Sequence, residues 1–297
     1  MNDDFAFDPN MGATAEVEFV TNAAGDPQLR RSWTAEEPKG TVLLVHGIAE
    51  HSGRYEHVAR QFLASGFSVV SFDQRSHGQT GGGQGDVGAF SDLHDDIELR
   101  LDELVGSSEP VVLLGHSMGG LVVAGYVLDQ QRPQPALVVL SSPSLGPFLP
   151  RGVQPLAVLV TKVVPGIKIK LPLDPDTLSR DSRVGDTYMA DPDVHLRQPL
   201  GLVGAMMGAA DDVSGHLPDW TATALVVHGA DDKLVPPESS EVMAQIPSVR
   251  RESYDGLRHE MFNEPDGPEV VADVISWIEA ELDQTSENGA EAVPDDE

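Results

Sequence analysis

Cysteine is absent from this sequence of 297 residues. Its absence excludes thiol nucleophiles, disulfide bonds and thiolate metal sites together. No run of apolar residues approaches the roughly 20 that a membrane-spanning helix requires. The N-terminal stretch, MNDDFAFDPN, is acidic and has neither the basic nor the apolar region of a signal peptide. We therefore expect a cytoplasmic protein.

Basic residues are also scarce. The chain has 19 Lys and Arg against 48 Asp and Glu, a formal net charge of −29, and only five of the basic residues are lysines. This balance argues against nucleic acid as a partner, because phosphate binding needs clustered Lys and Arg. An acidic, lysine-poor surface suits a high-salt cytoplasm, where ions screen the self-repulsion. An ordinary acidic protein from a GC-rich genome is the alternative explanation.

The strongest local signal is the stretch Pro110–Leu121, PVVLLGHSMGGL. The apolar run Val111–Leu114 turns sharply at Gly115 and then continues into a second apolar segment. A G-x-S-x-G match between a strand and a helix predicts a nucleophile elbow, in which Ser117 is lifted clear of the sheet. Gly115 and Gly119 are needed because side chains would collide in so tight a turn. The alternative is a strand-to-helix turn whose serine only caps the helix.

The elbow belongs to an alternation of strands and helices that runs through most of the chain. We expect strands at Glu16–Val20, Leu29–Thr34, Thr41–His46, Phe67–Phe72, Val111–Leu114, Ala136–Leu140, Ala224–His228 and Arg250–Tyr254. We expect helices at Tyr55–Ala64, Asp92–Val105, Leu121–Leu128, Glu238–Gln245 and Glu269–Leu282. This alternation predicts an α/β fold with a mostly parallel, doubly wound sheet and helices on both faces.

The alternation stops between residues 145 and 220, where proline-rich and helical pieces follow one another. This segment predicts a helical cap inserted over the C-terminal edge of the sheet, where such folds place their sites. Residues 15–144 and 221–282 should form the core. Both ends are acidic, and we expect residues 1–14 to be flexible and residues 283–297 to be disordered.

A serine hydroxyl needs a base within hydrogen-bond reach, and that base needs a third group to orient it. In the chain order serine, acid, histidine, two carboxylates, Asp231 and Asp232, lie just past the strand that ends at His228. His259 then lies in the loop before the last helix, and this position separates it from the other histidines. Position alone leaves both carboxylates open as the acid.

The remaining predicted site residues surround the elbow. The strand that ends at His46 supplies the second oxyanion donor in this architecture, so the backbone N–H groups of Ile48 and Met118 are the candidates. The expected supporting residues are His46, Gly47, Gly115, His116 and Gly119. No H-E-x-x-H or similar spacing indicates a metal site, and no cofactor is implied.

With these residues in view, the chain resembles the monoacylglycerol lipases of the serine α/β-hydrolases over roughly residues 40–282. The matching motifs are H-G-x-x-E-H-S-G-R-Y at 46–55, G-H-S-M-G-G at 115–120, G-x-x-D at 229–232, G-L-x-H-E-x-F-N-E-P at 256–265 and V-I-S-W at 274–277. That family places its catalytic acid three residues after the glycine, so the resemblance implies Asp232. Ser76 departs from the pattern, because the family usually has glycine there in a D-x-R-G-H-G turn.

The resemblance implies the α/β-hydrolase fold and hydrolysis of monoacylglycerols through an acyl-enzyme on Ser117. The same chemistry on a lysophospholipid or another carboxylester is the nearest alternative. A peptidase of similar fold would need an anchor for a free amine, for which Glu50 is a candidate. A non-catalytic binding protein would be indicated by a broken triad, and the triad here is complete. The sequence specifies no oligomeric state.

One further stretch, Leu145–Leu173, differs from the rest of the chain in charge. It contains no Asp or Glu, yet it carries three of the five lysines, Lys162, Lys168 and Lys170, among apolar residues. It could form the packing face of the cap, with its lysines extended into solvent. It could instead lie on a lipid surface, with apolar side chains inserted and basic groups at the headgroups, as a peripheral membrane contact.

Overall fold

The computed structural model describes residues 14–81, 85–104, 109–146 and 154–291. The N-terminus predicted as flexible lies outside the described residues, apart from Thr14, whose N–H donates to Glu56. Residues 292–297 of the predicted tail and residues 147–153 of the predicted cap also lie outside them.

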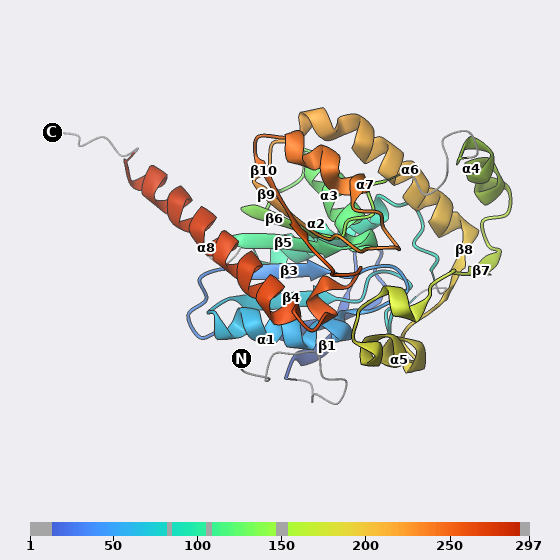
Figure 1. The fold of residues 1–297 in the computed structure, drawn as a ribbon, viewed down its shortest axis with the longest axis horizontal. Coiled ribbons are helices and arrows are strands. Elements are labelled where there is room, and N and C mark those ends of the chain that lie inside the picture. The colour runs from blue at the N-terminus through green and yellow to red at the C-terminus, as the bar shows by residue number, and fades with distance from the viewer. Residues whose placement is uncertain (1–13, 82–84, 105–108, 147–153, 292–297) are drawn as a thin grey trace.

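An eight-stranded sheet forms the centre of the molecule, in the order β1-β2-β4-β3-β5-β6-β9-β10 (Figure 1). β1 and β2 pair antiparallel, as do β2 and β4, and every other neighbouring pair is parallel. The strands are β1 (Glu16–Thr21), β2 (Pro27–Trp33), β3 (Thr41–Val45), β4 (Ser68–Phe72), β5 (Val111–His116), β6 (Leu137–Ser141), β9 (Ala224–Gly229) and β10 (Val249–Tyr254). The predicted α/β fold class is confirmed.

The central strands are apolar along their length because both of their faces are covered. In β3 every residue is buried, with Leu43 and Val45 in one hydrophobic cluster and Val42 and Leu44 in the other. The two clusters are the layers above and below the sheet. Continuous burial of this kind is expected of parallel strands with helices on both sides.

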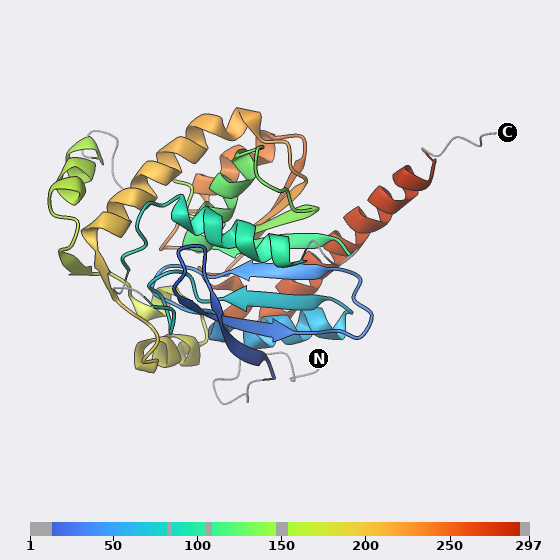
Figure 2. The same cartoon turned by 180° about the vertical axis from the view of Figure 1, so that it is seen from behind.

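Helices cover both faces of the sheet (Figures 1 and 2). α1 (Glu56–Ala64) and α8 (Gly267–Glu291) pack on one face through residues such as Phe62 and Val274. α2 (Asp92–Leu104) and α3 (Met118–Leu128) pack on the other through residues such as Ile97 and Leu121. α7 (Glu238–Glu241) is a short helix between β9 and β10.

The insertion between β6 and β9 forms the cap over the C-terminal ends of the strands (Figure 1). Its elements are α4 (Gln154–Val163), β7 (Lys168–Lys170), α5 (Ser182–Ala190), β8 (Arg197–Pro199) and α6 (Leu200–His216). β7 and β8 pair antiparallel as a separate two-stranded sheet. α6 carries Met206 and Val213 into the same cluster as α3, so it fixes the cap to the core. α4 packs along α6 at the outer end of the cap.

Two predicted elements differ from those observed. α8 continues past Leu282 to Glu291, so residues 283–291 are helical rather than disordered. No proline occurs between Pro268 and Pro294, so nothing removes a backbone donor from α8 there, although Ser286, Asn288 and Gly289 are weak helix formers. The single helix expected at Glu238–Gln245 is α7 followed by a 3₁₀ turn at Val242–Gln245.

Within the described residues, no helix has both the length and the hydropathy needed to cross a bilayer.

The charge of −29 predicts a stabilising effect of salt on this fold. We expect the unfolding midpoint to rise from low to molar KCl, because the screening length falls from about 10 Å at 0.1 M to about 3 Å at 1 M and relieves carboxylate repulsion. Surface ion pairs such as Arg132–Glu98 would weaken, but each contributes at most about 1 kcal/mol. Thermal unfolding followed by circular dichroism measures the effect. A midpoint that stays level or falls would contradict adaptation to high salt and would favour an ordinary acidic protein from a GC-rich genome.

Candidate active site

Ser117 lies at the sharp turn between β5 and α3. Its backbone has φ 53° and ψ −116°, a region that L-residues rarely adopt. A Cβ at Gly115 would lie 2.5 Å from the carbonyl oxygen of Gly119, and a Cβ at Gly119 would collide with the carbonyl of Val45 at the end of β3. Both glycines are therefore needed for the turn, as the sequence indicated.

The structure brings Ser117, His259 and Asp232 into one hydrogen-bonded line. The Ser117 Oγ lies 3.0 Å from Nε2 of His259, and Nδ1 of His259 lies 2.7 Å from Oδ2 of Asp232. All three residues are buried. They come from three separate connections at the C-terminal edge of the sheet, after β5, β9 and β10. We refer to them as the candidate triad.

The two neighbouring carboxylates have different environments. Asp232 is buried, and its Oδ1 accepts the N–H groups of Leu234 and Val235, both at 2.9 Å. Asp231 is exposed, and its N–H donates to the carbonyl of Leu257. Only Asp232 therefore faces His259, as the family resemblance implied.

Charge within the candidate triad shifts the pKa of both ionisable members. Burial alone would lower the pKa of His259, but the negative charge of Asp232 and its hydrogen bond outweigh burial and raise that pKa above the ordinary value. Burial would raise the pKa of Asp232, but the charge of His259 and several donated hydrogen bonds bring it far below its ordinary value. The carboxylate is therefore ionised at any pH at which the protein would work.

The loop after β3 lies beside Ser117 and contains the predicted oxyanion donor Ile48. The Gly47 N–H donates to Oε1 of Glu50 at 2.6 Å, which fixes the start of this loop. Met118 is the first residue of α3, so its N–H has no partner within the helix. The hydroxyl of Tyr188, from the cap helix α5, lies 3.5 Å from the carbonyl oxygen of Ile48.

The predicted supporting histidines are both buried and neutral. Nδ1 of His46 donates to the carbonyl of Gly47 at 2.8 Å, and its Nε2 accepts the N–H of Gln74 at 2.9 Å. These contacts join the loop after β3 to the loop after β4. Burial, assisted by the nearby charge of His259, lowers the pKa of His116 to about 4. The centroid of the His116 ring lies 4.9 Å from that of the His259 ring, so the two rings pack against each other.

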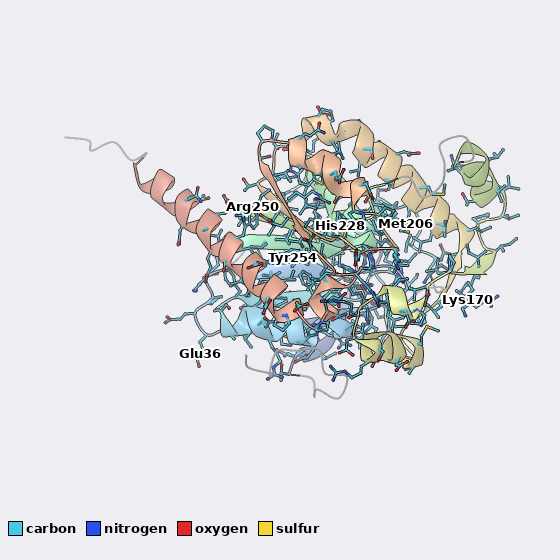
Figure 3. The ribbon with its side chains drawn as sticks, in the orientation of Figure 1. Glu36, Lys170, Met206, His228, Arg250 and Tyr254 are labelled. Atoms are coloured by element: carbon cyan, nitrogen blue, oxygen red, sulfur yellow. The ribbon has the colours of Figure 1, made fainter. Side chains whose placement is uncertain are left out.

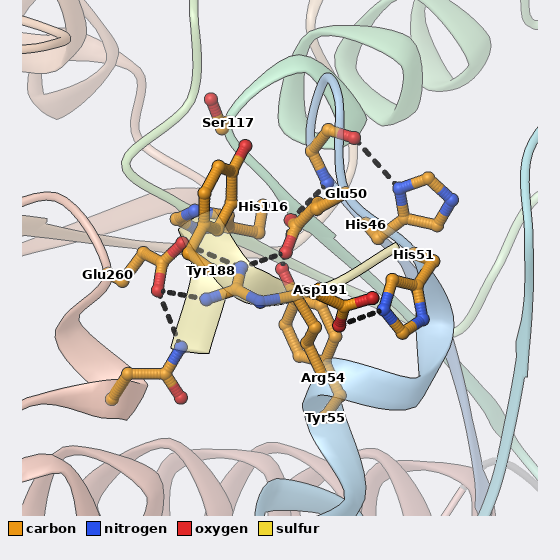
Figure 4. A network of polar contacts seen from close by, with 12 residues as sticks. His46, Glu50, His51, Arg54, Tyr55, His116, Ser117, Tyr188, Asp191 and Glu260 are labelled. Carbon is orange, nitrogen blue, oxygen red and sulfur yellow. Dashed lines mark hydrogen bonds and ion pairs between the residues drawn. The ribbon is translucent and has the colours of Figure 1, made fainter. Parts of the chain in front are cut away.

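A buried ionic cluster that the sequence did not predict closes the floor of the site (Figure 4). Arg54 pairs with both carboxylate oxygens of Glu260 at 2.7 Å and also with Glu50. Its guanidinium lies 4.5 Å from the centroid of the Tyr188 ring. Burial opposes ionisation of Glu50, but the charge of Arg54 and further contacts lower its pKa to about 2. All three charged residues stand in the quoted motifs, but no sequence signal paired Arg54 with Glu260, 206 positions away.

A pocket of about 240 Å³ opens from Ser117 into the cap. Its walls are mainly apolar and come from both cap and core. The lining includes Ile48, Ser117, Ser144, Leu171, Leu173, Leu178, Tyr188, Val203, Met206, Leu234, Val235 and His259 (Figure 3 labels Met206). The sequence predicted the cap but did not identify which cap residues line the pocket, because their approach to Ser117 depends on how the insertion folds back.

The turn that departs from the family pattern is retained in the structure. Ser76 has φ 62°, the left-handed region that glycine adopts without strain. Its hydroxyl donates to the carbonyl of Asp86 at 2.6 Å, which offsets part of that strain. Asp73, at the start of the turn, accepts the N–H and the hydroxyl of Ser52 and so holds the two loops together.

In the described part of the chain, one group of side chains has ligand atoms close enough to hold a cation. These are His51, Asp191 and Asp193, whose ligand atoms lie within 4.8 Å of one another. Their polar atoms are already paired: Nε2 of His51 donates to Asp191 at 2.9 Å, and Asp193 accepts from Gln79. The group is a contact between core and cap, apart from Ser117.

The chain is similar to known hydrolases in both sequence and structure. The profile of the family described as serine aminopeptidase, S33, matches residues 36–266. A monoacylglycerol lipase of Mycolicibacterium smegmatis is 38% identical over 84% of this chain and 92% of that protein. Phospholipase YtpA of Bacillus subtilis is 30% identical over 80% of this chain and 95% of that protein. The crystal structure of Paleococcus ferrophilus monoacylglycerol lipase has a TM-score of 0.77 and 28% identity, covering 89% of this chain and 99% of that one. The chain therefore belongs to the S33 serine hydrolase family of α/β-hydrolases, in the group that contains the monoacylglycerol lipases.

Proposed function

We propose that the chain is a monoacylglycerol lipase, which cleaves the ester bond of a monoacylglycerol and releases a fatty acid and glycerol. The observation that carries this proposal is the position of Ser117 between an apolar pocket and a buried polar floor. The apolar side suits one acyl chain, and the polar side suits a headgroup that bears hydroxyls. The name of the Mycolicibacterium smegmatis relative supports the same substrate.

The reaction assigns one role to each member of the candidate triad. Ser117 attacks the ester carbonyl while Nε2 of His259 takes its proton, and Asp232 orients the imidazole and stabilises the imidazolium. The backbone N–H groups of Ile48 and Met118 bind the oxyanion of the tetrahedral intermediate. His259 then returns the proton to the departing glycerol, and water hydrolyses the acyl-enzyme by the same steps in reverse order.

The ionic cluster argues against the aminopeptidase alternative. An amine anchor needs a carboxylate that is free to bind a cation. Oε1 of Glu50 already accepts the Gly47 N–H and the Tyr55 hydroxyl, and its Oε2 pairs with Arg54. Glu260 is occupied in the same way by Arg54 and Asn263. The oxygens of both carboxylates are therefore occupied by donors from within the protein, although Arg54 supplies one positive charge for the two of them.

The exposed side chains at the outer end of the cap support a peripheral lipid contact. Leu159, Val160, Val163 and Ile167 are each about half exposed or more, at 46–70%. Lys162, Lys168 and Lys170 lie among them and are also exposed (Figure 3 labels Lys170). We call these seven residues the cap patch. Apolar side chains beside basic ones are typical of a surface that inserts into an interface.

The cap patch also runs directly into the pocket. Leu171 and Leu173 follow β7 and line the cavity above Ser117. A lipid surface at the patch would therefore place acyl chains at the pocket entrance. Each lysine could contribute about 1 kcal/mol at an anionic surface, which opposes the repulsion of the acidic body. Residues 147–157 of the stretch named from the sequence have no described side chains, and Leu145 is buried in the core, so neither adds to this argument.

The substrate assignment predicts an order of rates across a panel of esters. We expect medium- and long-chain monoacylglycerols to be hydrolysed with higher kcat/KM than lysophospholipids, p-nitrophenyl esters or aminoacyl amides, as measured by product release. Ser117→Ala should fold normally and lose about 10⁴-fold or more on every substrate, because no acyl-enzyme can form. Preference for lysophospholipids would favour the activity named for the Bacillus subtilis relative. Activity retained by Ser117→Ala would exclude the mechanism.

Substitution at the two adjacent carboxylates should separate their roles. Asp232→Asn removes the charge that orients His259, and we expect a loss in kcat of up to about 10⁴-fold. Asp231→Asn changes an exposed residue of the same loop and should be nearly neutral. Steady-state kinetics of the two variants tests the choice. If Asp231→Asn caused the larger loss, the assignment of the acid would be wrong.

Charge reversal in the cap patch should separate lipid binding from chemistry. In a Lys162→Glu, Lys168→Glu, Lys170→Glu variant, we expect loss of binding to phosphatidylglycerol vesicles and of activity on dispersed long-chain monoacylglycerol. Cleavage of a soluble short-chain ester should be unchanged, because the patch lies away from Ser117.

A charge-matched variant serves as the control for that experiment. Lys39→Glu, Arg60→Glu and Arg250→Glu make the same change in net charge outside the cap. We expect this variant to bind vesicles more tightly than the patch variant. If the two variants behave equally, or if activity falls equally on both substrates, the cap patch is part of the cap's structure and has no role in lipid binding.

A further inference from the structure

A second histidine contacts the acid of the candidate triad. His228, at the end of β9, is completely buried, and its Nε2 lies 3.3 Å from Oδ2 of Asp232 (Figure 3). The same oxygen accepts from Nδ1 of His259. Asp232 therefore lies between two imidazoles, one of which faces Ser117 and the other the core.

The neighbours of His228 determine which ring nitrogen carries its proton. Nε2 lies 3.0 Å from the carbonyl oxygen of Val235 as well as near Asp232, and both of these oxygens can only accept. A bare Nε2 would face two acceptors in a buried site, which is strongly unfavourable. Nε2 therefore carries the hydrogen, which it donates to the carbonyl of Val235, and Oδ2 of Asp232 lies beside the same N–H at 3.3 Å.

The opposite side of the ring fits the same assignment. Nδ1 of His228 lies 2.8 Å from Oγ of Ser240, whose one hydrogen can go to this nitrogen or to the carbonyl of Pro237 at 3.1 Å. The Ser240 oxygen in turn accepts from Nε of Arg251 at 3.0 Å. Arg251 belongs to the edge strand β10 and also donates to the carbonyl of Pro237. A line of polar contacts thus runs from the edge of the sheet through Arg251, Ser240 and His228 to Asp232.

We propose that His228 is a positioning residue for the acid of the candidate triad. The loop N–H groups hold Oδ1 of Asp232, and His228 holds Oδ2 on the line to His259. Without that contact, Oδ2 would be held only by the imidazole that it must orient. This inference rests on the proposed function, because it gives His228 a role in a reaction assigned to Ser117.

A merely structural histidine would give different results from a positioning one. His228→Leu removes the donor at nearly constant apolar size, whereas His228→Gln keeps an N–H near the Nε2 position. For His228→Leu we expect kcat on a short-chain monoacylglycerol to fall about 10- to 100-fold, the loss typical of one hydrogen bond to a charged group. KM should change by no more than about twofold. His228→Gln should recover most of the lost rate.

The pH profile separates positioning from loss of stability. The acid limb of kcat/KM follows the pKa of His259, which Asp232 raises. If Oδ2 moves out of line in His228→Leu, that support weakens and the limb shifts to lower pH, while His228→Gln keeps the wild-type limb. Glu50, Glu260 and His116, the other ionisable groups facing His259, remain in place in both variants.

His94→Leu provides the matched control. His94 is a partly buried histidine on α2 that packs between Phe90 and Tyr126, away from Ser117. We expect this variant to lower the unfolding midpoint without changing the acid limb. The proposal is overturned if His228→Leu also changes only the midpoint, if His228→Gln is no better than His228→Leu, or if the limb moves to higher pH with kcat retained.

A measurement on the unmodified protein covers the case in which His228→Leu does not fold. The ¹⁵N resonances of labelled histidine should show hydrogen on Nε2 of His228, and an Nε2 without hydrogen would contradict the proposal. Ser117→Ala and Asp232→Asn distinguish the two levels of inference. If both lose activity but His228→Leu does not, only the role of His228 fails. If neither loses activity, the proposed function fails.

Discussion

Three buried carboxylates, on Glu50, Asp232 and Glu260, surround the site of Ser117, and its arrangement depends on how their charge is compensated. An uncompensated carboxylate at such depth would take up a proton or unfold the loop around it. Glu50 and Glu260 share Arg54, while Asp232 is held by loop N–H groups and by the ring of His259. One cation for three carboxylates leaves excess negative charge beside His259, so the imidazolium that forms during attack by Ser117 is favoured.

The same compensation fixes the cap to the core. The guanidinium of Arg54, held by core carboxylates, packs against the ring of Tyr188 from α5. His51, three residues earlier, donates to Asp191 just beyond that helix, and Arg180 pairs with the fully buried Glu264. Each of these pairs joins a residue of the insertion to a loop that borders Ser117. The pocket above Ser117 is therefore shaped by contacts that would have to break before the cap could move.

The sequence was informative wherever a local pattern has a local cause. Glycines at 115 and 119 predicted the elbow because their lack of a side chain is what permits the turn, and position along the chain identified His259. Contacts between distant segments had no such signal. The approach of Tyr188 to Arg54 depends on the folded path of the insertion, and the approach of His228 to Asp232 depends on the loop after β9. The helix beyond Leu282 was missed because acidic composition was taken as a sign of disorder, although no proline interrupts α8 there.

Positive charge is scarce on this acidic protein, and part of it is concentrated in the cap patch. A body of net charge −29 repels an anionic surface from every side, so any approach to lipid would be oriented by the few places where positive charge gathers. Three of the five lysines lie in the cap patch, together with the apolar side chains of α4, and the chain continues from them into the pocket wall. Repulsion elsewhere would then act as an orienting force, because it disfavours every contact except the one that presents the pocket entrance.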